Sequence, residues 1–138
     1  MGRPRNPPKL EAVLADPFLF ISRLSVVDKK GKLCKLIPNG EQIEIIRALH
    51  SGDDTLILKS RQIGSTTAVA AYFFWKWYVS SSPTTHVILS HKMTSSQHIF
   101  KMFKRFWDSL PETLRRPLAL NTNHTMVLQD TGATLQAH

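Results

Sequence analysis

The chain has 138 residues, 42% of them hydrophobic, and its 18 Lys and Arg against 10 Asp and Glu give a formal net charge of +8. This length is that of one domain, which excludes a motor and a nuclease in the same chain. The charge favours a polyanionic partner, with nucleic acid ahead of a membrane surface. The single Cys34 cannot form an internal disulfide, as expected in a reducing cytoplasm, and the six scattered histidines show no metal-ligand spacing.

The first third of the chain predicts an arm, a short helical segment and a hairpin. Residues 1–9 are basic and rich in Pro, without the apolar core of a signal peptide, and predict a flexible arm that either contacts DNA phosphates or lies in solvent. Residues 10–24 have apolar residues at helical spacing, interrupted at Asp16-Pro17. Residues 24–28 and 32–36 predict a β-hairpin that turns near Gly31. For its lysines, at positions 29, 30, 32 and 35, a solvated turn is favoured over a DNA contact.

The central stretch predicts a helix, a buried strand, a turn and a second helix. Residues 41–49 follow Pro38-Asn39-Gly40 and have one apolar side, typical of a helix. Residues 55–58 form a short apolar run that is typical of a buried strand. After a turn over residues 59–66, residues 67–75 continue as a helix that is apolar nearly all round. Lys76 interrupts this run, which makes it too short to cross a membrane, so we expect it in the core.

The strand, turn and helix of residues 55–75 have the layout of a phosphate-binding loop. Main-chain N–H groups meet at the turn and at the helix N-terminus, where the helix dipole adds about half a positive charge. The consensus G-x-x-x-x-G-K-[ST] is met at Gly64 and Thr66, but Lys59 stands where it has Gly and Ser65 where it has Lys. Thr66 could present its hydroxyl to Mg²⁺, and Lys59 or Arg61 could supply the displaced charge. The alternative is a plain strand, loop and helix with Gly64 at the bend.

The remaining sequence predicts a second strand and helix and a C-terminal hairpin. The strand covers residues 86–90, the helix runs from a Ser/Thr cap at 94–97 to Leu110, and the hairpin covers 124–137 with its turn at 130–132. His91 and Lys92 follow the strand, where they either contact phosphates or belong to a surface loop. We expect an α/β fold, a three-layer P-loop NTPase-type sheet with parallel strands and helices on both faces, with the loop at the carboxyl end of the 55–58 strand.

The segment Ser60-Arg61-Gln62-Ile63-Gly64-Ser65-Thr66-Thr67 resembles the Walker A segment of the large terminase subunits of tailed bacteriophages, the motors that package viral DNA into procapsids. Many members carry S-R-Q-hydrophobic-G-K-T-T, and lambda-like members place the lysine at the front of the loop, as Lys59 is placed here. The strand and capped helix after the loop and the hairpin of residues 124–137 are also similar to the terminase pattern. The resemblance therefore covers residues 10–138, as the N-terminal part of a P-loop ATPase domain.

This resemblance implies cofactors, partners and residue roles. The cofactors would be ATP and Mg²⁺. The partners would be double-stranded DNA, the small terminase subunit and the portal. The compartment would be the cytoplasm of the bacterial host, with no membrane involved. Gln42 would contact the adenine, since its carboxamide pairs a donor with an acceptor; without the neighbouring loop, a helix-surface Gln is the simpler interpretation. Arg61 would act as an arginine finger in the chemical step, and Lys59 would bind ground-state phosphates. The implied nucleotide-binding residues are Gln42, Lys59, Ser60, Gln62, Ile63, Gly64, Ser65, Thr66 and Thr67, with Thr66 also the Mg²⁺ ligand.

A working P-loop ATPase also needs an apolar strand that ends in acidic residues, for Mg²⁺ and for the attacking water. The sequence contains no such strand, because Asp53-Asp54 precede a strand and Asp130 lies in a turn. We therefore expect a truncated terminase, for example from a prophage, without the Walker B strand and the nuclease domain, that hydrolyses no ATP by itself. Two other hypotheses are a fragment of a helicase-type nucleic-acid-dependent ATPase and a non-enzymatic basic protein that binds nucleic acid or a partner.

Overall fold

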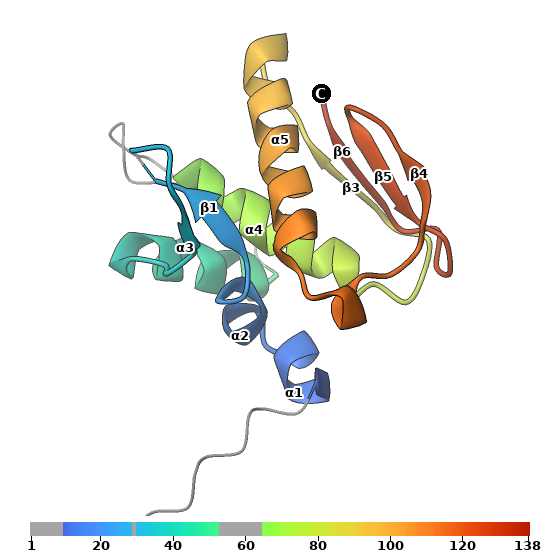
Figure 1. Ribbon diagram of the computed structural model, residues 1–138, viewed down its shortest axis with the longest axis horizontal. Coiled ribbons are helices and arrows are strands. Elements are labelled where there is room, and N and C mark those ends of the chain that lie inside the picture. Colours follow the sequence, from blue (N-terminus) through green and yellow to red (C-terminus); the bar gives the residue numbers. More distant parts are fainter. Residues whose placement is uncertain (1–9, 29, 53–64) are drawn as a thin grey trace, which may run out of the picture.

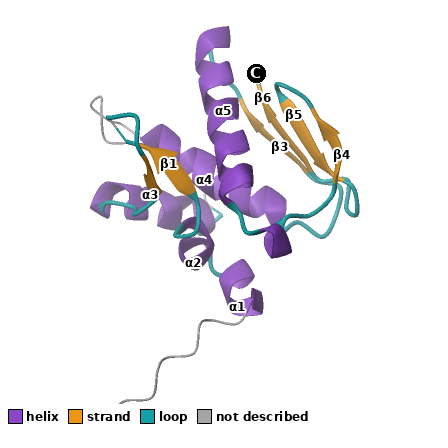
Figure 2. Ribbon diagram, in the orientation of Figure 1, coloured by secondary structure: helices purple, strands orange, loops and turns teal. Residues whose placement is uncertain are grey.

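The computed structural model describes residues 10–28, 30–52 and 65–138 (Figure 1). The predicted arm of residues 1–9, Lys29 and the predicted strand at 55–58 lie outside these ranges. The described part consists of helices and two small sheets (Figure 2). Its elements are α1 (Leu10–Ala15), α2 (Pro17–Ile21), β1 (Ser25–Val27), β2 (Leu33–Lys35), α3 (Gly40–His50), α4 (Ser65–Tyr78), β3 (Thr85–Ile88), α5 (Met93–Ser109), the 3₁₀ helix η1 (Glu112–Leu114), β4 (Leu118–Asn121), β5 (Thr125–Leu128) and β6 (Thr134–Ala137).

Strands β1 and β2 form the predicted N-terminal hairpin, with Val26 opposite Cys34. Its turn is held by Asp28, whose Oδ1 accepts the main-chain N–H of Lys30 and of Lys32, both at 2.9 Å. Gly31 has φ +79°, a conformation that residues with a side chain rarely adopt. The hairpin prediction is confirmed, because the local turn chemistry and the strand pattern agree.

The second sheet has four strands in the order β3-β6-β5-β4. Strands β3 and β6 are parallel, whereas β5 pairs antiparallel with both β6 and β4. The predicted hairpin of residues 124–137 is confirmed as β5 and β6, and Gly132 in its turn has φ +75°. A Cβ at Gly132 would lie 3.3 Å from the Cβ of Pro83, so the turn is packed closely against the loop before β3.

Helices α4 and α5 cover one face of this four-stranded sheet (Figure 1). That face carries Leu135 and Met126, which are fully buried. The two are opposite each other in the pairing of β5 with β6, so their side chains lie on the same side of the sheet. On the opposite face Val87 and Leu120 are exposed, and in the described part of the chain no helix covers them. The α/β class is confirmed. The described residues show one covered face of a mixed sheet, not helices on both faces.

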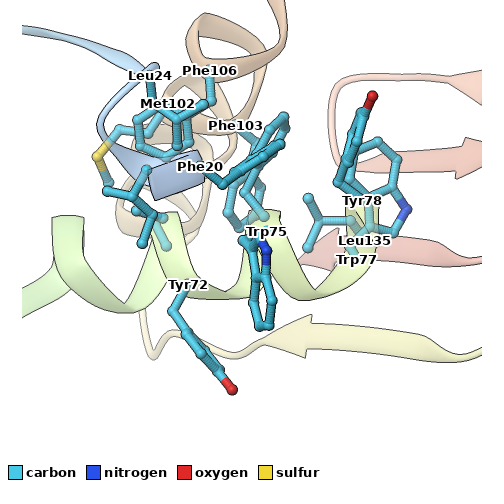
Figure 3. Close-up of a cluster of buried hydrophobic side chains, with 14 of the residues drawn as sticks. Phe20, Leu24, Tyr72, Trp75, Trp77, Tyr78, Met102, Phe103, Phe106 and Leu135 are labelled. Carbon is cyan, nitrogen blue, oxygen red and sulfur yellow. The ribbon is translucent and has the colours of Figure 1, made fainter. Parts of the chain in front are cut away.

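The core is built around α4, which packs against α2, α3, α5 and β6. Phe74 and Trp77 of α4 are fully buried, and the ring centroid of Phe74 lies 5.6 Å from that of Phe106 on α5. Figure 3 shows Trp77 and Phe106 in this cluster of buried side chains. Two indole N–H groups are satisfied by carbonyl oxygens at 2.8 Å: Trp75 donates to Leu14 and Trp77 to Ala133. The prediction of a buried core helix is therefore confirmed. Among the described helices, none combines the length and apolar character that a membrane span requires.

Candidate functional site

A cavity of about 740 Å³ lies where the first turns of α4 and α5 meet the carboxyl end of β3. Ligand sites in proteins commonly have volumes of about 300 to 1,000 Å³, and in open α/β sheets they lie at the carboxyl ends of strands. The described residues that line it come from three elements and the loop after β3: Thr66, Val69, Ile88, Leu89, Ser90, His91, Thr94, Ser95, His98 and Ile99.

Two adjacent threonines at the start of α4 direct their side chains to different neighbours. Thr66 is exposed and lines the cavity, whereas the hydroxyl of Thr67 donates to the sulfur of Met102 on α5 at 3.8 Å. Successive residues of an α-helix point about 100° apart, so the two hydroxyls serve different neighbours. Thr66 is thus placed to contact a ligand, and the side chain of Thr67 joins α4 to α5.

The opposite wall begins where β3 ends. The main-chain N–H of His138 donates to Ile88 O at 3.0 Å, and that of Ser90 donates to His138 O at 2.6 Å, which extends the parallel pairing of β3 with β6 by one step. These bonds fix the direction in which the chain leaves the strand. The next residues, His91 and Lys92, enter α5; His91 lines the cavity, and Lys92 is not among its described lining residues.

Helix α5 starts earlier than the sequence indicates. We expected a Ser/Thr cap at residues 94–97, and this prediction is wrong, because the N-cap is Lys92 and supplies no side-chain hydrogen bond. The N–H groups of Ser95 and Ser96 already bond to Lys92 O, so the helical ladder includes them. Ser96 Oγ donates to Met93 O at 2.8 Å, the bonding pattern of a serine inside a helix.

The electrostatics of the cavity favour an anion. The first turns of α4, with Thr66, and of α5, with Thr94 and Ser95, both border it, and each helix N-terminus carries a partial positive charge. The lining includes the imidazoles of His91 and His98 and, among the described residues, no carboxylate. A ligand with phosphate groups would therefore meet dipoles and hydroxyls without a facing negative charge.

Gln42, the predicted adenine contact, lies at the third position of α3 and is buried. Its Oε1 accepts the main-chain N–H of Asn39 at 2.9 Å, while its own N–H donates to Asn39 Oδ1 at 2.9 Å, a reciprocal capping box. Gln42 is not among the described residues that line the cavity. Its carboxamide thus has a structural task at the start of α3, and its contact with adenine stays a prediction.

Most of the predicted phosphate-binding loop lies outside the described residues. This part comprises Lys59, Ser60, Arg61, Gln62, Ile63 and Gly64. Ser65 is the first residue of α4, two positions earlier than the predicted start at residue 67. The sequence pattern missed Ser95, His98 and Ile99 on the far wall, although their helical spacing with His91 could have indicated one face of α5 directed at the strand end.

Comparison with known proteins assigns no family to this chain. No protein-family model matches it, and no curated protein matches it.

Proposed function

We propose that this chain is part of the ATPase domain of a phage terminase large subunit and that it binds Mg²⁺-ATP in the cavity beside α4. The observation that carries the proposal is the position of Thr66. This residue fits the Ser/Thr position of the phosphate-loop consensus, and its side chain lines a cavity at the end of a parallel strand. The proposal rests further on the resemblance of residues 60–67 to terminase Walker A segments.

In this proposal the first turn of α4 holds the phosphates. Main-chain N–H groups at a helix N-terminus are suited to phosphate oxygens, and those of Ser65, Thr66 and Thr67 stand at the start of α4. Lys59 and Arg61, from the loop sequence, supply the positive charge. Helix α4 packs against α2, α3 and α5, and its first turn is joined to α5 by the hydrogen bond from Thr67 to Met102.

Mg²⁺ fits the residues that are present. Thr66 offers a hydroxyl oxygen at the cavity wall, and Mg²⁺ in nucleotide sites is commonly bound by one or two protein oxygens, phosphate oxygens and water. When bound, the ion would neutralise phosphate charge. Thr66 would then orient the ion.

The resemblance to terminases suggests three partners for the whole assembly: double-stranded DNA, the small terminase subunit and the portal. The compartment that it suggests is the cytoplasm of the bacterial host.

Replacing Thr66 with Val tests the site, since Val keeps the branched shape and removes the hydroxyl. We expect Mg²⁺-ATP to bind about tenfold more weakly, the effect of losing one hydrogen-bonding or ligand group to a charged partner, with ATP in EDTA little affected. Isothermal titration calorimetry with and without Mg²⁺ measures both affinities.

Thr67→Val is the matched control, because it removes the neighbouring hydroxyl that bonds Met102 instead of facing the cavity. It should leave the Mg²⁺ dependence of ATP binding unchanged. Equal losses in the two variants would contradict the assignment of Thr66, and an unchanged Mg²⁺ dependence in Thr66→Val would contradict it as well.

A further inference from the structure

A groove of about 340 Å³ lies between α5 and the N-terminal hairpin, on residues that the nucleotide site does not use. The hairpin packs beside α5 (Figure 1), and the N–H of Ser25 at the start of β1 donates to Ser109 Oγ of α5 at 3.1 Å. The described residues that line the groove are Leu33 from β2 and Lys101, Lys104, Arg105, Asp108 and Ser109 from α5.

Three cations stand on one wall of this groove against one carboxylate. Lys104 and Arg105 stand three and four positions after Lys101, so each is a neighbour of Lys101 on the surface of α5, with Cβ atoms about 5 to 6 Å from that of Lys101. Among the described residues none of the three forms an ion pair; the one described ion pair is that of Arg116 with Asp130. The Lys104 ammonium lies 5.8 Å from the Phe100 ring centroid, which keeps it over the surface of the helix.

The hairpin adds charge next to this wall. Lys32 precedes Leu33 in the chain and is exposed, as is Lys30. Both residues sit in a turn whose main chain is fixed by Asp28 Oδ1, so these lysines extend from a fixed base. Their side chains and those of α5 are separate in sequence, yet the fold brings the two elements together.

We propose that this groove binds the phosphate backbone of double-stranded DNA. Phosphate binding requires an array of unpaired cations and little else, and each neutralised phosphate releases counterions. An acidic protein segment would need an apolar pocket for an anchoring side chain, whereas the described lining offers Leu33 alone, itself 61% exposed. The groove therefore favours a DNA contact beside the hairpin, whereas the sequence alone favours a solvated turn for the hairpin lysines.

The test is the salt dependence of binding to a fluorescein-labelled, mixed-sequence duplex about two helical turns long, followed by anisotropy between about 50 and 200 mM potassium chloride. The slope of log K against log salt is about 0.9 per neutralised phosphate. We expect Lys101→Ala/Lys104→Ala to reduce the slope by roughly 2 and to weaken binding at the lowest salt by about tenfold or more. Alanine favours the helix, so α5 should persist, and circular dichroism checks this.

Arg47→Ala/Lys76→Ala is the matched control. It removes two exposed cations from α3 and α4, so its net charge equals that of Lys101→Ala/Lys104→Ala. It should change the slope by less than half as much. Equal changes in the two pairs would overturn the proposal, because binding would then follow overall charge, and so would an unchanged slope in Lys101→Ala/Lys104→Ala. Binding of a Glu-rich peptide without binding of the duplex would overturn it in favour of an acidic protein segment.

The measurement is made without nucleotide and repeated with Gly64→Asp, a substitution in the proposed phosphate loop. DNA binding should be the same in that variant. Failure of the parent chain to bind ATP, with intact duplex binding, would count against the proposed nucleotide site alone. An unchanged salt slope in Lys101→Ala/Lys104→Ala, with intact ATP binding, would count against the groove alone.

Discussion

Trp77→Ala is expected to lower the free energy of unfolding by about 3 to 5 kcal/mol, the usual cost of removing a large aromatic side chain from a core. Trp77 is fully buried, with its ring centroid 5.4 Å from that of Phe74 and 5.9 Å from that of Trp107. Its indole N–H also donates to Ala133 O at 2.8 Å, which ties α4 to the start of β6. A single domain has a stability of about 5 to 15 kcal/mol, so this variant would be close to unfolding. Thermal and urea denaturation followed by circular dichroism measure the loss.

Two further variants separate the causes of this effect. Trp77→Phe keeps most of the packing and removes the indole hydrogen bond to Ala133 O, which still accepts the main-chain N–H of Leu128 at 3.0 Å, so the loss should be about 0.5 to 1.5 kcal/mol. Trp107→Ala removes an aromatic residue that is only partly buried at the edge of the same cluster, and should cost less than Trp77→Ala. A Trp77→Ala protein that unfolds at the same urea concentration as the parent would show that α4 is not the centre of the core.

Lys59→Ala is expected to weaken ATP binding by roughly ten- to a hundredfold, the effect of losing a charged group that binds phosphate oxygens. Lys59 stands at the front of the loop, where the resemblance to terminases places the displaced lysine. Its long stem could bring the ammonium over the phosphates as a point charge. Titration of a fluorescent ATP analogue with Mg²⁺ present measures the change.

Arg61→Ala is the control for Lys59→Ala, because Arg61 is proposed to act in the chemical step and its loss should largely spare binding. Ser65→Lys restores the consensus and should partly rescue Lys59→Ala, since its ammonium would reach the same phosphates. If Lys59→Ala binds the analogue as tightly as the parent, Lys59 does not take the place of the consensus lysine.

The parts of the fold that could be predicted are those with a strong local signal. The two hairpins turn at Gly31 and near Gly132, which have φ +79° and +75°, and a Gly in the turn is the signal that the sequence shows. Helix α4 was recognisable as a core helix because apolar residues surround it on nearly every side. Asn39 caps the N-terminus of α3, and the preference of Asn for this position is also a local property of the residue.

The parts that could not be predicted depend on contacts between distant residues. The start of α5 at Met93 has no capping side chain, so it is set by the packing of the helix and by the bonds that hold the end of β3 to His138. Strand β4 is mostly exposed and has no clear alternation, and it forms because β5 offers it an edge. The second wall of the cavity and the basic groove are likewise products of tertiary packing, since β3, α5 and the hairpin meet only in the folded chain.

The difference between Thr66 and Thr67 illustrates both kinds of information. The sequence places two hydroxyls at the start of a helix after a Gly, which is enough to suggest a phosphate site. The folded chain adds that Thr67 bonds to Met102, 35 residues later on α5, whereas Thr66 lines the cavity. The candidate site could thus be placed from sequence at one end of α4, while its lining residues on β3 and α5 could not.

A calorimetric titration of Mg²⁺-ATP into the parent chain and into Gly64→Asp tests the proposed nucleotide site most directly. We expect saturable binding at one site by the parent. In the variant we expect binding at least about tenfold weaker, because the new side chain removes the conformational freedom of Gly and its carboxylate would stand beside the phosphates. No saturable binding by the parent, or equal binding by both proteins, would contradict the assignment of this loop and of the cavity beside α4 to a nucleotide.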